Sequence, residues 1–257
     1  LIHIPPLQLT WDMLLAPSSA WFTFLLSWGI FAVLGAKSGW DKQTTGCLIL
    51  VAGLANTSFL GFPIVELLYG KEALATAFLI DQGGSFLLVS TLGVYIGSRY
   101  GNGDRTVVQV LKKMVLFPPF LFLLAGLWMS YFRLTLPVVL LPWLQGVGTS
   151  MAPVAMAVIG LTMSLDSKWT QNKSLWYGLG YRLLLAPACV WIVYGLILPS
   201  DGLTLKVLVL ESGMAPMITG ALLAMEFGLQ PRLATLLAGI GIPICGISLL
   251  LWQYLLG

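Results

Sequence analysis

The chain has 257 residues, of which 58% are hydrophobic and only 9% are charged, and its mean hydropathy is +0.92. Soluble proteins carry roughly a quarter of charged residues, so this composition excludes an ordinary soluble domain and indicates an integral membrane protein. The net charge of +3 is spread through the polar connections, which argues against binding of nucleic acid.

Apolar runs follow one another along the chain, separated by short polar connections. At ~20 residues for each span, the chain has room for about eight transmembrane helices. After a proline-containing segment, residues 1–13, we predict spans at 14–36, 44–68, 74–98, 114–132, 137–165, 175–198, 203–227 and 233–256. The fold class predicted is therefore all-α and multi-pass, with the lipid bilayer as its surroundings.

Basic residues are divided unevenly between the two sides that these spans create. Since cytoplasmic loops carry an excess of Lys and Arg, the richer side is predicted to be cytoplasmic and both chain ends to lie outside. The richer side holds Lys37, Lys42, Arg99, Arg105, Lys112, Lys113, Lys168, Lys173, Arg182 and Arg232, and the other side holds Lys71, Arg133 and Lys206.

Two spans are interrupted by polar residues, glycine and proline. The second span contains residues 56–63, and the seventh contains residues 211–216. Proline removes a backbone donor and glycine is a poor helix former, so each span is predicted to break into two half-helices. Because freed backbone groups cannot face lipid, such a pair of broken helices points to the substrate site of a transporter.

Spans one to three and six to eight share an order: a plain helix, a broken helix and a helix that contains glycine. They enter the membrane from opposite faces, which predicts an inverted repeat. The first repeat would occupy residues 1–98 and the second residues 114–257, joined by the cytoplasmic basic loop 99–113. The first repeat is then two helices short, so we expect two further helices before this chain.

Polar side chains at the first interruption are candidates for substrate binding. Asn56 offers an amide, and Thr57 and Ser58 add hydroxyl groups. The amide of Asn56 could instead join two helices. The N-terminal end of a half-helix can hold a carboxylate without a basic residue. Arg182 is predicted to extend to the cytoplasmic end of its span, as long basic side chains do.

Asp81 and Glu211 are the carboxylates predicted to lie deepest in the membrane. An ionisable group at that depth is costly, so a function is the first hypothesis. We expect a role in proton or sodium coupling for both, and placement at a helix end is the alternative.

Enzyme signatures are almost absent from the sequence. The one histidine is His3, outside the spans, and the three cysteines lie inside apolar runs without the spacing of metal ligands. We therefore expect no enzyme activity, no metal site and no cofactor.

The first interruption resembles a signature of the auxin efflux carrier family, which includes bacterial permeases and the plant PIN proteins. The residues that carry the resemblance are Asn56-Thr57-Ser58-Phe59-Leu60-Gly61-Phe62-Pro63, and in the last third Glu211-Ser212-Gly213-Met214-Ala215-Pro216, followed by Gly241-Ile242-Pro243. The basic loop is short where long plant PIN proteins carry a large insert, which favours a prokaryotic type of permease in the plasma membrane.

The resemblance implies ten helices in a five-plus-five inverted repeat, in which the fourth and ninth helices are broken and cross at the substrate site. It also implies a small organic anion, such as auxin or a dicarboxylate, as substrate, and a homodimer as the assembly. The substrate-binding residues that we predict are Asn56, Thr57, Ser58, Gly61, Pro63, Gln82, Ser212, Gly213, Pro216 and Thr219.

The favoured function is a secondary carrier that works by alternating access. A passive channel is the nearest alternative, but a channel needs a continuous polar stripe through several spans. A membrane sensor that binds a ligand without moving it is the third hypothesis.

Overall fold

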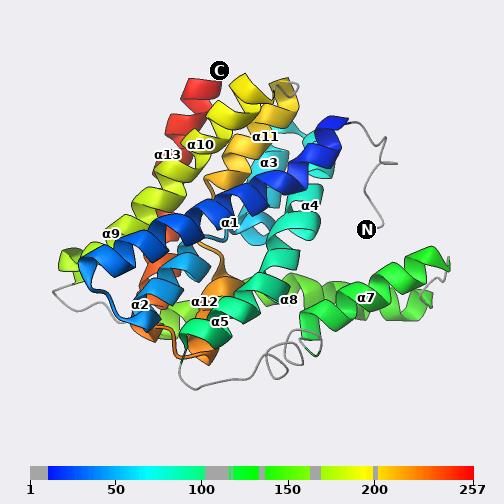
Figure 1. Cartoon of the computed structure of the whole chain (residues 1–257). Helices are drawn as coiled ribbons and strands as arrows, with labels where there is room; N and C mark the ends of the chain where they lie inside the picture. The colour runs from blue at the N-terminus through cyan, green and yellow to red at the C-terminus, as the bar shows by residue number, and fades with distance from the viewer. Residues whose placement is uncertain (1–10, 102–115, 117, 133–136, 163–168, 199–201) are drawn as a thin grey trace.

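The computed structural model describes residues 11–101, 116, 118–132, 137–162, 169–198 and 202–257, and Figure 1 shows the course of the chain. These residues form helices joined by short connections, and within these ranges the only β-type pairing is one isolated bridge. The predicted all-α class is therefore confirmed for the described part. His3 and most of the basic loop 99–113 lie outside it.

The first three predicted spans correspond to helices of the structure. The first is α1 (Trp11–Ser38). The second begins as α2 (Lys42–Cys47) and η1 (Leu48–Ala52), is interrupted at residues 53–56, and resumes as η2 (Thr57–Gly61) and α3 (Phe62–Tyr69). The third is one helical stretch made of η3 (Lys71–Ala73), α4 (Leu74–Ile80), η4 (Asp81–Phe86), η5 (Val89–Gly93) and α5 (Val94–Tyr100).

The middle of the chain lies at the side of the molecule. Here α7 (Pro118–Tyr131) extends outward from the main group of helices in Figure 1. After the short η6 (Val138–Leu140), α8 (Leu141–Thr162) packs against two helices of the last third, α12 (Ile218–Glu226) and α13 (Pro231–Leu256). Large apolar side chains such as Trp128 and Trp143 are exposed on α7 and α8, as expected of helices that face lipid.

The last third repeats the order of the first. After η7 (Trp169–Gln171), a plain helical stretch consists of α9 (Lys173–Gly180), η8 (Tyr181–Leu185), α10 (Ala186–Ile192) and η9 (Val193–Ile197). An interrupted helix follows as α11 (Gly202–Ser212) and α12 (Ile218–Glu226), and α13 (Pro231–Leu256) closes the chain.

Four helical stretches of the described residues are long and apolar enough to cross a membrane, namely residues 15–38, 71–100, 173–197 and 231–256. The two interrupted helices are shorter in each of their halves. A multi-pass membrane protein is thus supported, while the number of eight spans and the five-plus-five repeat stay predictions.

Figure 1 shows the connections after α1 and before α13 at one end of the molecule, and the connection after α3 and the C-terminus at the other. At one end, the Nε2 of Gln230 donates to the Oδ2 of Asp41 at 2.9 Å, so the connection after α1 meets the one before α13. At the other end, the hydroxyl of Tyr69 donates to the Oε1 of Gln253 at 2.5 Å. Which of these ends faces the cytoplasm stays a prediction.

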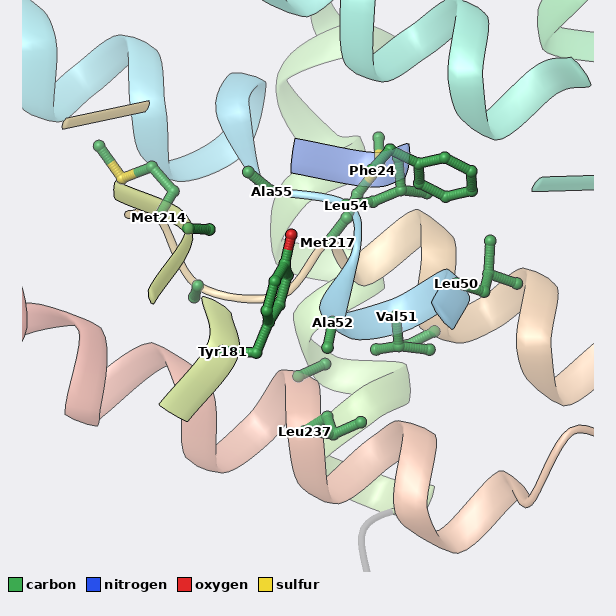
Figure 2. Close-up of a cluster of buried hydrophobic side chains, with 14 of the residues drawn as sticks. Phe24, Leu50, Val51, Ala52, Leu54, Ala55, Tyr181, Met214, Met217 and Leu237 are labelled. Carbon is green, nitrogen blue, oxygen red and sulfur yellow. The ribbon is translucent and has the colours of Figure 1, made fainter. Parts of the chain in front are cut away.

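The core lies where the two interrupted helices meet. Residues 47–57 and 207–218 are all buried. Figure 2 shows Leu54 and Ala55 of the first interruption near Met217 of the second, with the ring of Tyr181 beside them. α1 covers this centre, because it packs against η1, η4 and α11. The fold therefore buries both interruptions, which keeps their backbone groups away from lipid.

Candidate functional site

The two interruptions pair with each other through their backbones. The amide N–H of Asn56 donates to the carbonyl of Ala215 at 2.9 Å, and the N–H of Met217 donates to the carbonyl of Leu54, also at 2.9 Å. Ala55 and Pro216 therefore form an antiparallel bridge. Each interruption satisfies donors and acceptors that the other one leaves free, which explains how non-helical backbone is tolerated at this depth.

Local sequence explains where the second interruption falls. Pro216 has no backbone N–H to donate to a helix, and it lies in the paired segment. It is buried against Gly241 of α13, where an added Cβ would lie 2.6 Å from the Cδ of Pro216. The close approach of α13 thus depends on glycine at this position.

The first interruption lies earlier than the sequence suggests. It occupies residues 53–56, and Pro63 is the second residue of α3, with an exposed side chain. The helical stretch is continuous from Thr57 to Tyr69, so Pro63 lies within it, directly after the π-helical segment η2; such local π-helical adjustments accommodate a proline inside a membrane helix. Pro63 therefore lies inside the downstream half-helix, and it does not line the paired segments.

Three predicted residues form one hydrogen-bonded group beside the first interruption. The hydroxyl of Thr57 donates to the Oδ1 of Asp81 at 2.5 Å, and the Nε2 of Gln82 donates to its Oδ2 at 2.7 Å. Asp81 is buried, and it begins the π-helical segment η4, whereas Thr57 begins η2. Such π-helical segments occur often at functional sites. Both oxygens of this carboxylate accept a hydrogen bond.

Glu211 stands in a different environment. Its side chain is fully buried, and neither carboxylate oxygen has a hydrogen-bond partner in the structure. The carboxylate packs against the Cα of Gly61, where a Cβ atom would meet both oxygens, one of them at 2.6 Å. The structure thus brings together the predicted residues Gly61 and Glu211, and leaves an unpartnered acid at the centre of the protein.

Arg182 is a residue of this site that the sequence prediction misplaced. The prediction that it extends to the cytoplasmic end of its span is wrong, because the side chain is fully buried. Its Nη1 donates to the carbonyl of Gly53 at 2.9 Å, and its Nη2 donates to the carbonyl of Ser212. The available signal was that Arg182 lies seven residues inside the predicted span 175–198, about two helical turns from its end. The sequence alone does not show whether such a side chain turns inward or toward the membrane surface.

A small cavity of about 10 Å³ lies among these groups. A space of this size holds about one water molecule. Its lining is rich in hydroxyl and charged groups and includes two further polar residues of α1, Ser19 and Thr23, that the sequence prediction did not name. The lining residues are Ser19, Ala20, Thr23, Gly53, Leu54, Ala55, Thr57, Ile80, Ser85, Arg182, Glu211 and Ser212.

The other predicted residues divide into two groups. Asn56 is buried, and its Nδ2 has no hydrogen-bond partner. Ser212 and Gly213 are buried next to the paired segment, although the hydroxyl of Ser212 donates to the carbonyl of Val209 at 2.8 Å in its own helix. Ser58 and Thr219 are half-buried in the first turns of the two downstream half-helices. Of these five residues, Ser212 alone lines the cavity.

Known proteins similar to this chain are transporters. A family model described as "Membrane transport protein" matches residues 4–253. An uncharacterized transporter of Methanocaldococcus jannaschii is 30% identical over 236 residues, which cover 89% of this chain and 74% of that protein. An uncharacterized transporter of Methanothermobacter thermautotrophicus is 28% identical over 248 residues, which cover 95% of this chain and 79% of that protein. With its buried, paired interruptions and these relatives, the chain belongs to the membrane transport protein family, which is the family of the auxin efflux carriers.

Proposed function

We propose that this transporter is a secondary carrier that moves a small organic anion by alternating access, with the anion held at the paired interruptions. The observation that carries the proposal is the unpartnered Nδ2 of Asn56, a buried donor next to two helix N-termini. A buried donor without a partner is costly, so a ligand that accepts its hydrogen bond would bind with a gain in free energy.

The downstream half-helices supply the remaining attraction for an anion. One begins at Thr57 and runs to Tyr69, and the other, α12, begins at Ile218. Their first amides point N-terminally without helical partners, and this end of a helix carries a partial positive charge. The hydroxyl groups of Ser58 and Thr219 lie in these first turns. A carboxylate bound between the two ends and Asn56 therefore needs no basic side chain.

Movement of the helices is part of the proposal. The cavity of about 10 Å³ is too small for an organic anion, so this conformation is closed around the site. A carrier opens such a site to one side of the membrane at a time, usually by motion of one repeat against the other. The interrupted helices belong to different repeats of the predicted arrangement, and their pairing would be the contact across which the repeats move.

Asp81 and Glu211 are the proposed coupling groups, and their surroundings favour different roles. Asp81 receives two hydrogen bonds, which stabilise a charged carboxylate. Glu211 receives none, and an isolated charge in a buried site is very costly. Glu211 is thus the better candidate for a group that takes up a proton or a cation during the cycle, while Asp81 fixes Thr57 in place.

The setting in the membrane follows from the charges at the two ends. Excluding the buried Arg182, nine basic residues remain on the side proposed as cytoplasmic and three on the other. We propose a plasma-membrane protein whose C-terminus lies outside. A homodimer is proposed as the assembly, on the resemblance to the auxin efflux carriers alone.

Transport by purified protein in lipid vesicles tests the proposal. Uptake of labelled malonate and of indole-3-acetate is measured, and a carrier is expected to show saturation and counterflow from the opposite side. A flux without saturation or counterflow would indicate a channel, and binding without flux would indicate a sensor.

The variant Asn56→Ala tests the proposed binding residue. We expect the half-saturating concentration of the transported anion to rise about tenfold or more, because a hydrogen bond to a charged group is lost. The matched control is Ser90→Ala, since the hydroxyl of Ser90 is also buried without a partner but belongs to η5 and not to either interruption. An equal change of the half-saturating concentration in both variants would contradict a role of Asn56 in binding the substrate.

A further inference from the structure

Arg182 occupies an unusual position for a basic residue in a membrane protein. Among the residues that the structure describes, it is the only buried Lys or Arg. It lies in the π-helical segment η8, next to Tyr181, whose hydroxyl donates to the carbonyl of Thr23 in α1. The protein therefore holds a charged group at its centre, where burial is energetically unfavourable, and this indicates a specific role for Arg182.

The partners of Arg182 are backbone carbonyls of both interrupted helices. From the first helix, the carbonyls of Ala52 and Gly53 accept from Nη1 at 3.5 Å and 2.9 Å. From the second, the carbonyl of Ser212 accepts from Nη2. These carbonyls stand at the C-terminal ends of the two upstream half-helices, where no helical N–H remains to satisfy them. One guanidinium group thus joins the two ends.

Charge supports the same interpretation. The C-terminal end of a helix carries a partial charge of roughly −0.5, so two such ends together offset a single positive charge. Glu211, the one acid in the cavity lining, has no hydrogen-bond partner, so the guanidinium is bonded to the helix ends and not to this carboxylate. Arg182 and the two ends form a unit with little net charge.

Carbonyls at the C-terminal ends of broken helices are also where secondary transporters bind a coupling sodium ion. In this chain the guanidinium group already fills that position. We propose that Arg182 is a built-in cation that replaces a free sodium ion at the two half-helix ends, so that this site does not respond to sodium. The inference rests on the proposed transport site, and it restricts the coupling ion, if Glu211 takes one up, to a proton.

Thermal unfolding of the purified protein in detergent tests this inference without any transported substrate. The unfolding midpoint is measured in sodium chloride and in choline chloride at equal ionic strength, with and without millimolar methylguanidinium. For the unchanged protein, we expect the same midpoint in both salts and no effect of methylguanidinium. A sodium-specific rise of that midpoint would overturn the inference.

The variant Arg182→Ala removes the guanidinium group from the carbonyls at the two half-helix ends, so that a free cation can bind there. We expect its midpoint to fall by roughly 10 °C, because buried carbonyls lose a charged donor. Methylguanidinium is expected to restore part of this loss, and sodium is expected to raise the midpoint of this variant alone. The exposed Arg99 provides the control, since Arg99→Ala should leave the midpoint unchanged in every salt.

Two results with Arg182→Ala would contradict the inference: an unchanged midpoint, or a loss that neither cation relieves. If this variant gives no folded protein, Arg182→Lys takes its place. Its ammonium keeps the charge but lacks the fork that spans both ends, so an intermediate midpoint is expected, and a midpoint equal to that of the unchanged protein would count against the bridging role. Because no transport is measured, failure here leaves the test of the carrier itself intact.

Discussion

Gly61 and Glu211 pack so closely that a Cβ atom on Gly61 would lie 2.6 Å from one oxygen of the Glu211 carboxylate and nearer still to the other. The two residues come from different interrupted helices, and both are buried. The absence of a side chain on Gly61 is what admits the acid to the centre of the protein. This contact couples the position of Glu211 to that of the first interrupted helix.

The variant Gly61→Ala is expected to displace the Glu211 carboxylate. We expect a loss of about 1–3 kcal/mol in the free energy of unfolding, since a methyl group is forced into a filled space, and slower transport. Chemical denaturation and vesicle uptake measure the two effects. Gly180→Ala is the matched control, because Gly180 is also helical and has nothing within 4 Å of an added Cβ. Equal losses for both variants would contradict the role of the contact.

Replacement by an amide should change the stability of the protein differently at the two buried carboxylates, Asp81 and Glu211. Glu211→Gln removes an unpartnered charge, so we expect unchanged or higher stability together with uptake that no longer depends on pH. Asp81→Asn turns a donor group toward Thr57 or Gln82, so we expect a loss of about 1–3 kcal/mol. Unfolding and uptake at acidic and alkaline pH measure both. A pH profile of Glu211→Gln equal to that of the unchanged protein would exclude Glu211 as the coupling group.

The sequence predicted the existence of the two interruptions better than their positions. Glycine and proline weaken a helix locally, so both interrupted helices could be recognised without a structure. The first interruption, however, falls at residues 53–56 and not at Pro63. Pairing with residues 213–217 of a distant segment decides where the helix ends, whereas Pro63 lies inside the downstream half-helix, directly after the π-helical segment η2.

Arg182 shows a second limit of the sequence. Its distance from the end of its span suggested a side chain that extends to the membrane surface. The side chain instead turns inward to Gly53 and Ser212, from a π-helical segment that shifts the face on which each residue lies. Neither the π-helical segment nor the carbonyls that accept hydrogen bonds from Arg182 can be recognised from composition or spacing.

The hydrogen bond from Thr57 to Asp81 is expected to hold the first downstream half-helix in place. Thr57→Val removes the donor and keeps the shape, so we expect a loss of about 1–3 kcal/mol, since a buried acceptor is left with one bond fewer. Thr91→Val is the control, because the hydroxyl of Thr91 bonds only to the Leu87 carbonyl of its own helix. The unfolding midpoints of the two variants, compared with that of the unchanged protein, decide the matter, and a larger effect at Thr91 would contradict the prediction.

Asp41 ties two connections at one end of the molecule, and its effect should depend on pH. Its Oδ1 accepts from the N–H of Thr44 at 2.6 Å as the N-cap of α2, and its Oδ2 accepts from Gln230. Burial raises the pKa of Asp41, but the hydrogen bonds from Thr44 and Gln230 outweigh it, so the pKa lies below its ordinary value of 3.8. A lowered pKa means that the charged form contributes stability above that ordinary value, and that the contribution is lost as the pH falls through the lowered pKa.

The variant Asp41→Ala should therefore cost about 1 kcal/mol near neutral pH, the usual value of an N-cap, and less in acid. Asn at the same position keeps an oxygen that accepts from Thr44 but has no charge to lose, so Asp41→Asn should cost less and show a smaller change with pH. Chemical denaturation over a series of pH values measures the difference between each variant and the unchanged protein. A difference for Asp41→Ala that grows as the pH falls would contradict the assignment, because it would place the pKa of Asp41 above its ordinary value.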